Sequence, residues 1–283
     1  MNSQSQHTSS DYIHGSSPEE QRRLSLLNEL LNQASARELG LRGGERILDV
    51  GSGLGQFTRV MARTAGAGGR ALGIERDHAQ LAEANRLASK AGESELTEFR
   101  QGNALDLPLR SDEWGSFDLA HARFLLEHIS DPMSVISQMV DAVRPGGRVV
   151  VADDDHGDFR PWPEPDGFHG IWQAYVRSYE RKGNDPYIGR RLVFLLHEAG
   201  LCSIRNTCVF FGGCAGSETF MAVADNLISV LIGAKEDIVS GEFLDEASYF
   251  TSIDGLMRWK EDPSSALWYS LCWAEGSVPK DGA

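Results

Sequence analysis

Residues 47–55 read Ile-Leu-Asp-Val-Gly-Ser-Gly-Leu-Gly, and this stretch decides the fold. The apolar run has the composition of a buried strand, and the alternating glycines predict a tight turn directly after it. Helix-like spacing follows at Phe57, Val60 and Met61. Glycine adopts the positive φ that such a turn demands and leaves no side chain between backbone and ligand. The helix start offers N–H groups and a positive dipole end to an anionic group.

The next predicted strand, residues 70–75, ends in a carboxylate. It reads Arg-Ala-Leu-Gly-Ile-Glu, and Glu75 falls twenty residues after Gly55. An acid at the end of the second strand is placed to accept hydrogen bonds from both ribose hydroxyls of an adenosine. The two stretches together predict a nucleoside-binding α/β domain. The alternative is an α/β domain with a tight turn and no nucleoside.

The spacing of the glycines indicates which nucleoside is bound. The dinucleotide fingerprint is G-x-G-x-x-G, whereas here the third glycine comes one residue early and Gln56 occupies the position that the dinucleotide pattern would fill. Asp49 stands two residues before the first glycine. In these features the chain resembles the class I S-adenosylmethionine-dependent methyltransferases, in their small-molecule, ubiquinone/menaquinone-methyltransferase-like branch. The resemblance covers roughly residues 44–155 and recurs near the C-terminus.

That resemblance implies an α/β fold with a Rossmann-like, doubly wound, seven-stranded sheet, an antiparallel last strand and helical cap insertions. It also implies S-adenosyl-L-methionine as cofactor. The turn would hold the methionine end, Glu75 the ribose, and the loop after the third strand the adenine. The cofactor contacts implied in this way are Tyr12, Gly51, Ser52, Gly53, Gln56, Glu75, Arg76, Asn103, Ala104 and His121.

Two of these contacts have a plainer alternative. The family usually has aspartate where this chain has Asn103, whose amide oxygen accepts a hydrogen bond without carrying charge. Asn103 can equally be an ordinary turn residue. Tyr12 either closes over the cofactor or attaches the first helix to the core.

Candidate catalytic residues lie at the carboxyl ends of the fourth and fifth predicted strands, the edge where open α/β sheets bind ligands. A base is needed only if the acceptor is a hydroxyl or an acidic carbon, and His121, Asp154 and His156 are the candidates. The acids of residues 153–155 could also bind Mg²⁺ or form a solvated turn. No metal is expected, because metal-dependent family members usually place an acid after the fourth strand, where this chain has His121.

Residues 157–185 are rich in aromatic residues and proline. They predict a cap that either binds a flat apolar acceptor or packs its rings into a small core of its own. Helical periodicity predicts a second insertion before the last strand. The expected organisation is a disordered tail (1–10), an N-terminal helical lid (11–42), the cofactor-binding core (43–155), a substrate cap (156–186), further core (187–215), a helical insertion (216–262), and the last core strand with its tail (263–283).

The composition of the chain limits which kinds of partner and compartment are expected. The 283-residue chain has a net charge of −14, which repels nucleic-acid phosphates. No run of ~18 apolar residues predicts a membrane span, and the polar N-terminus has no apolar signal region, which favours a cytoplasmic protein. The four cysteines have no C-x-x-C spacing and are expected to be reduced and mostly buried.

The predicted function is therefore methyl transfer to a small-molecule acceptor, aromatic or apolar in character, with the methylated atom (O, N or C) unresolved. The alternative is a member of the same fold that has lost methyl transfer and acts as a cyclase or scaffold. A nicotinamide oxidoreductase is disfavoured by Gln56 and the antiparallel last strand. The oligomeric state is left open, with a homodimer among the options.

Overall fold

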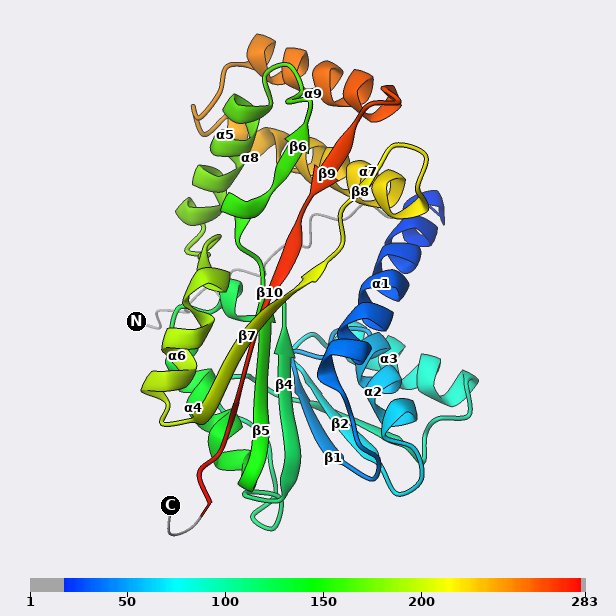
Figure 1. Cartoon of the computed structure of the whole chain (residues 1–283), viewed down its shortest axis with the longest axis vertical. Helices are drawn as coiled ribbons and strands as arrows, with labels where there is room; N and C mark the ends of the chain where they lie inside the picture. Colours follow the sequence, from blue (N-terminus) through cyan, green and yellow to red (C-terminus); the bar gives the residue numbers. More distant parts are fainter. Residues whose placement is uncertain (1–17, 281–283) are drawn as a thin grey trace, which may run out of the picture.

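The computed structural model describes residues 18–280, with side chains from residue 28 onward. Its core is a seven-stranded sheet in the order β3-β2-β1-β4-β5-β10-β7 (Figure 1). Strand β10 runs antiparallel to both of its neighbours, β5 and β7. The predicted sheet with an antiparallel last strand is thereby confirmed. The strands are β1 (Arg46–Val50), β2 (Arg70–Glu75), β3 (Thr97–Gln101), β4 (Phe117–Arg123), β5 (Val143–Asp153), β7 (Cys202–Phe210) and β10 (Ser270–Ser277).

Helices cover both faces of this sheet. Because side chains alternate along a strand, Ile47 of β1 packs into one apolar cluster with Met61, whereas Leu48 packs into another with Ile136. The first cluster lies under α1 and α2 and the second under α4 and α6, which explains the near-continuous apolar composition of β1. The helices around the core are α1 (Pro18–Leu39), α2 (Gln56–Ala65), α3 (His78–Lys90), α4 (Pro132–Ala142) and α6 (Leu192–Glu198).

The turn between β1 and α2 needs its glycines for two different reasons. Gly51, Gly53 and Gly55 all have positive φ, at 75°, 56° and 67°. At Gly55 there is also no room, because a Cβ would lie 2.3 Å from Cζ of Phe99 in β3. The third glycine of the motif therefore allows β3 to pack closely against the turn.

A second lobe stands over the carboxyl ends of the core strands (Figure 1). It contains a small antiparallel sheet in the order β6-β9-β8. The segment after β5 and the segment after β7 build this lobe together, because α5 packs against α8 and α9 and β6 pairs with β9. Its elements are α5 (Phe168–Arg181), α7 (Glu218–Gly233), α8 (Lys235–Val239), α9 (Glu246–Glu261), β6 (Arg160–Trp162), β8 (Gly213–Cys214) and β9 (Ala266–Trp268).

The segment predicted to contain the last core strand, which begins at residue 263, contributes strands to both lobes. Residues 266–268 form β9 in the cap sheet, and β10 begins at Ser270 in the core sheet. Tyr269 lies between them and is buried. This segment therefore connects the cap directly to the core, so the cap is one unit assembled from two insertions.

The cysteine expectation was wrong in one respect. All four cysteines are free, but Cys202, Cys208 and Cys214 are exposed and Cys272 is half-buried. Cys202 and Cys208 lie on β7, the outermost strand of the core sheet, where one side of the strand has no neighbour to cover its side chains.

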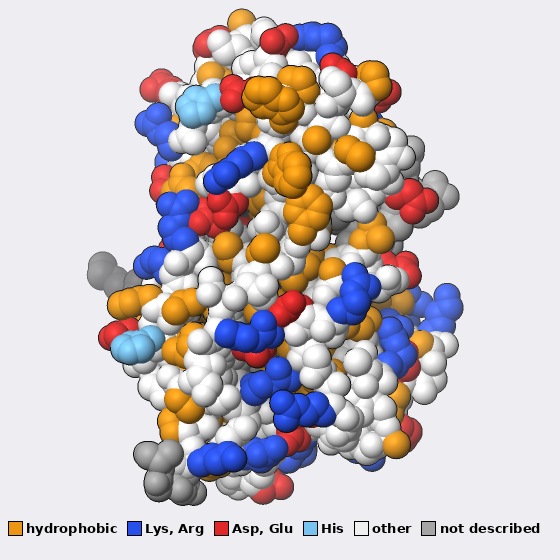
Figure 2. All heavy atoms as spheres, viewed as in Figure 1, with side chains coloured by type: hydrophobic (Ala, Val, Ile, Leu, Met, Phe, Trp, Pro, Cys, Tyr) orange, Lys and Arg blue, Asp and Glu red, His pale blue; other side chains and the backbone are white. Residues whose placement is uncertain are grey.

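The surface over the core sheet carries many Lys and Arg side chains, while hydrophobic side chains are exposed higher up, over the cap (Figure 2). Several of these cations are paired: Arg144 with Asp118, and Arg148 and Arg205 with Glu275. Their charge is thus offset locally. No helix within residues 18–280 is long and apolar enough to cross a membrane.

Candidate functional site

The Glu75 carboxylate at the end of β2 is held in place by two backbone N–H groups. Its Oε2 accepts a hydrogen bond from Gly53 N at 2.9 Å, and its Oε1 accepts one from Asp77 N at 2.7 Å. Glu75 thus bridges the glycine turn and the start of α3. A carboxylate has about four lone-pair sites, so two remain for donors such as hydroxyl groups.

The N–H groups of the glycine turn are largely used within the chain. Gly51 N and Ser52 N both donate to Ile74 O, at 2.9 and 3.0 Å, and Gly55 N donates to Ser52 O. Together with the bond from Gly53 to Glu75, they leave little of the anion-binding capacity that the sequence predicts for the turn. Ser52 Oγ is buried without a hydrogen-bond partner.

The other predicted cofactor contacts differ in exposure. Gln56 begins α2 and is half-buried, Arg76 is exposed, and Ala104 is buried. Asn103 is exposed, and its Oδ1 accepts from Leu105 N at 3.0 Å, the arrangement of an Asx-turn. The oxygen expected to face an adenine amino group therefore has a local partner. Tyr12 lies outside the described residues.

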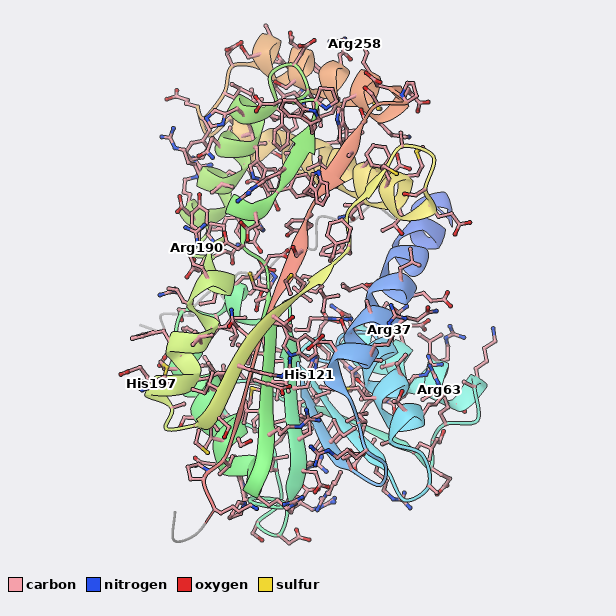
Figure 3. All side chains as sticks on the ribbon, viewed as in Figure 1. Arg37, Arg63, His121, Arg190, His197 and Arg258 are labelled. Carbon is pink, nitrogen blue, oxygen red and sulfur yellow. The ribbon has the colours of Figure 1, made fainter. Side chains whose placement is uncertain are left out.

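His121 lies inside the core sheet, on β4 beside Asp49 of β1 (Figure 3). Its side chain is 1% exposed, and its Nδ1 lies 2.8 Å from Asp49 Oδ1. The second Asp49 oxygen accepts from the Thr58 hydroxyl of α2. A buried imidazole paired in this way joins two strands and a helix, and it is poorly placed to take a proton from an acceptor.

Two of the three consecutive acids after β5 have backbone or arginine partners. Asp153 Oδ2 accepts from Leu125 N and Leu126 N, at 3.2 and 2.8 Å. Asp155 forms a two-pronged pair with Arg190, both contacts being 2.6 Å long. Arg190 belongs to the short helix η3 (Ile188–Arg191) at the base of the cap (Figure 3). These contacts fix the loop that carries Asp154 and His156.

The structure brings Asp154 and His156 together and adds a residue that the sequence analysis missed. His156 Nε2 lies 3.9 Å from Asp154 Oδ2 and 3.8 Å from Oε2 of Glu127. Glu127 belongs to the short helix η1 (Leu126–His128) after β4, and His156 begins η2 (His156–Asp158). The sequence feature that could have indicated Glu127 is an acidic residue shortly after the fourth strand. One ligand atom from each of the three lies within 4.8 Å of the others, so the group could hold a metal ion.

Aromatic side chains of the cap enclose this group. The His156 ring stacks on Tyr175, with centroids 5.8 Å apart and planes at 20°, and Trp172 Nε1 donates to the His156 carbonyl at 2.8 Å. The Tyr179 hydroxyl faces Glu127, and the Tyr269 hydroxyl faces Asp154.

Burial and mutual repulsion change the charges of the group. Desolvation, followed by the neighbouring carboxyls, raises the pKa of Glu127 well above its ordinary value. The same causes raise the pKa of Asp153 to about 7, and desolvation raises that of Asp154 to about 6. Desolvation lowers the pKa of His156 to about 4. His156 is therefore neutral at neutral pH and able to accept a hydrogen bond or a proton.

The family described as "Methyltransferase domain" matches residues 48–151. Residues 48–151 form a methyltransferase domain. The matched segment of this domain begins at Leu48 in β1, includes the glycine turn and Glu75, and ends at Val151 in β5. The family predicted from the sequence is thereby confirmed, and the cap lies largely outside the match.

Curated proteins similar to this chain are also named methyltransferases. The chain is 31% identical over 182 residues to O-methyltransferase resE of Aspergillus sclerotiorum, covering 61% of this chain and 62% of that protein. It is 26% identical over 197 residues to demethylmenaquinone methyltransferase of Bacillus velezensis, covering 63% and 80%. The chain spans 51–53% of the length of other curated relatives. A Bacillus halodurans protein solved as a candidate methyltransferase has a TM-score of 0.56 at 18% identity, covering 90% of this chain and all of that one.

Proposed function

We propose that this chain is an S-adenosylmethionine-dependent methyltransferase acting on a small-molecule acceptor. The observation that carries the proposal is the Glu75 carboxylate, held by Gly53 N within a domain of the methyltransferase family. Such a carboxylate retains lone pairs for ribose hydroxyls. The methyltransferase names of the curated relatives support the same reaction.

The residues present fit this cofactor. The turn has glycine at positions 51 and 53, so backbone can approach the methionine end closely, and Ser52 Oγ is a buried group that still needs a partner. In the proposal Glu75 binds the ribose, and Asn103 and Ala104 border the adenine, with Tyr12, Gln56 and Arg76 completing the contacts. When bound, S-adenosylmethionine supplies a methyl group on a positively charged sulfur.

On the acceptor side, the task of the protein is to hold the acceptor atom in line with the donor. Positioning of this kind, with reacting atoms ~3 Å apart, can lower a barrier by several kcal/mol. We assign the acceptor side to the region between the strand ends and the cap, where Asp154 and His156 lie together. His121 is left out of the catalytic set because its side chain is only 1% exposed inside the core sheet.

A small molecule is a better acceptor than nucleic acid, because the net charge of −14 opposes a phosphate backbone. The rings of the cap favour an acceptor with aromatic or apolar parts. Four free cysteines, three of them exposed, favour a reducing compartment such as the cytoplasm.

Calorimetry with S-adenosylmethionine and with NAD tests the cofactor. We expect S-adenosylmethionine to bind and NAD not to bind, because the N–H groups of the turn that would hold a pyrophosphate are used within the chain. Formation of S-adenosylhomocysteine with a panel of small acceptors then tests transfer. Binding of NAD alone would overturn the proposal, and cofactor binding without demethylated product would indicate a member that has lost methyl transfer.

A further inference from the structure

Glu127, Asp154 and His156 form a buried cluster whose hydrogen bonding is incomplete. Glu127 Oε2, Asp154 Oδ1 and His156 Nδ1 are all buried without a hydrogen-bond partner. Glu127 is 5% exposed and His156 6% exposed, so bulk water does not cover them. Leaving a buried polar atom unsatisfied is costly. Among these atoms Glu127 Oε2 faces into the cluster, 3.8 Å from His156 Nε2, so a ligand that brings a donor would satisfy it.

The cluster is acidic, and its charge is not compensated. Within residues 28–280, no Lys or Arg forms an ion pair with Glu127, Asp153 or Asp154. The nearby arginines of η3 are already paired, Arg190 with Asp155 and Arg191 with Asp185. Burial is the main cause of the raised pKa values of Glu127, Asp153 and Asp154, and the neighbouring carboxyls add to it. A positively charged ligand would compensate the charge of the cluster.

Aromatic faces line the same cluster. Around His156, the rings of Trp172, Tyr175 and Tyr179 have centroids at 5.4, 5.8 and 5.4 Å. Aromatic faces attract organic cations, and desolvation strengthens the attraction. Carboxylates combined with aromatic walls are suited to an ammonium group. An ammonium nitrogen could be shared between the carboxylates at charge-assisted hydrogen-bonding distance, ~2.8 Å.

The cluster is separated from solvent by a thin layer. Tyr179 is half-buried, and its hydroxyl lies 3.2 Å from Nδ1 of His128, whose side chain is 49% exposed. His128 Nε2 also lies 3.6 Å from Glu127 Oε1, so His128 connects the Glu127 carboxyl to the exposed surface.

We propose that Glu127, Asp154 and His156, with the rings of Tyr175 and Tyr179, form the acceptor site for an amine, whose nitrogen is the atom methylated. This inference rests on the proposed function. A hydroxyl acceptor is disfavoured because it must lose its proton in a negative environment. The same environment and burial already raise the pKa of the Tyr175 and Tyr179 hydroxyls.

The step balances without a further reactant. The bound ammonium first gives a proton to the Asp154 carboxylate or to neutral His156, which frees the nitrogen lone pair. That lone pair forms the N–C bond as the S–C bond of the donor breaks, and both electrons of the broken bond remain on sulfur. Positive charge returns to nitrogen next to the carboxylates, which stabilise it, and the proton held by the protein leaves to water.

Matched amine and alcohol pairs test the inference. Thermal unfolding of the full chain is measured at pH 7.5 with 2-phenylethylammonium and with 2-phenylethanol, and S-adenosylhomocysteine formation is measured over a panel of such pairs. We expect the amines to stabilise the protein and to be turned over at least about tenfold faster. Glu127→Gln and Asp154→Asn should each weaken amine binding about tenfold or more, the usual effect of losing a charged hydrogen bond. Glu164→Gln, an exposed cap residue, is the matched control.

Several results would overturn the inference. They are equal responses to amine and alcohol, no response to either, and amine binding that is unchanged in Glu127→Gln and Asp154→Asn. Stabilisation by MgCl₂ alone, lost in the same variants, would instead identify a metal site. If S-adenosylmethionine binds and only alcohols are methylated, the inference fails while the proposed function stands. If S-adenosylmethionine does not bind, the proposed function fails first.

Discussion

The Nδ1 atom of His121 in β4 lies 2.8 Å from the Oδ1 atom of Asp49 in β1. Thr58 of α2 donates its hydroxyl to the other oxygen of the same carboxylate. Asp49 therefore joins two central strands and the helix that follows the glycine turn. Asp49, two residues before the first glycine, therefore has a structural role: its contacts hold together the elements on both sides of the turn.

Removal of this pair should cost stability. His121→Ala leaves a cavity and deprives the buried Asp49 carboxylate of one partner, so the free energy of unfolding should fall by about 2–4 kcal/mol. Urea denaturation measures the change. His197→Ala, at a 76% exposed side chain of α6, should leave stability unaltered. A His121→Ala protein of normal stability that binds cofactor but does not turn over would make His121 the base after all.

The Glu75 carboxylate should determine cofactor affinity. Glu75→Gln keeps an oxygen for Gly53 N but loses the charge that strengthens bonds from ribose hydroxyls, and Glu75→Ala loses both acceptors. We expect the Kd for S-adenosylmethionine to rise about tenfold and about a hundredfold, respectively. Calorimetry gives both values. Glu95→Gln, at an exposed position before β3, is the control, and an unchanged Kd in Glu75→Ala would refute the assignment.

Two glycines with nearly the same φ separate backbone strain from steric overlap. Gly55 has φ 67° and Gly92, after α3, has φ 70°, but a Cβ at Gly55 would overlap the Phe99 ring, whereas one at Gly92 meets open space. Gly92→Ala should cost about 1 kcal/mol, and Gly55→Ala about 1–3 kcal/mol more. Urea denaturation of the two variants gives the difference directly. Equal losses would mean that the Phe99 contact is unimportant.

Stability should depend on pH through the buried cluster. Asp154 has a folded pKa of about 6 against an ordinary 3.8, so the folded state binds more protons and its stability falls as pH rises from ~4 to ~6. The pKa of Asp153, raised to about 7, extends this fall in stability to about pH 7. His156 acts oppositely: its pKa of about 4, against an ordinary 6.5, makes stability rise between those values.

Asp154→Asn isolates one of these contributions. Its free energy of unfolding should fall less steeply than that of the parent chain between pH 4.5 and 6.5, because one proton-binding group has been removed. Urea denaturation at a series of pH values measures the slope. Asp166→Asn, at an exposed cap position, should keep the parent slope. A steeper fall in Asp154→Asn would show that the Asp154 pKa is not raised.

Much of the core was predictable, because its signals are local. The glycine turn needs positive φ at Gly51 and Gly53, and only glycine adopts it readily. The carboxylate of Glu75 follows its strand by simple continuity of the chain. The role of His121 was not predictable, because its partner Asp49 is far away in the sequence and becomes its neighbour only through β1–β4 pairing.

The sequence by itself determined the strand–turn–helix unit, the acid after the second strand and the family, since each depends on residues close together in the chain. Only the tertiary structure decided that two insertions form one cap and that Glu127 joins Asp154 and His156. Those contacts depend on the docking of α5 and η1 over the ends of β4 and β5. Packing of distant segments creates both the burial and the shared charge, and no short stretch of sequence carries either.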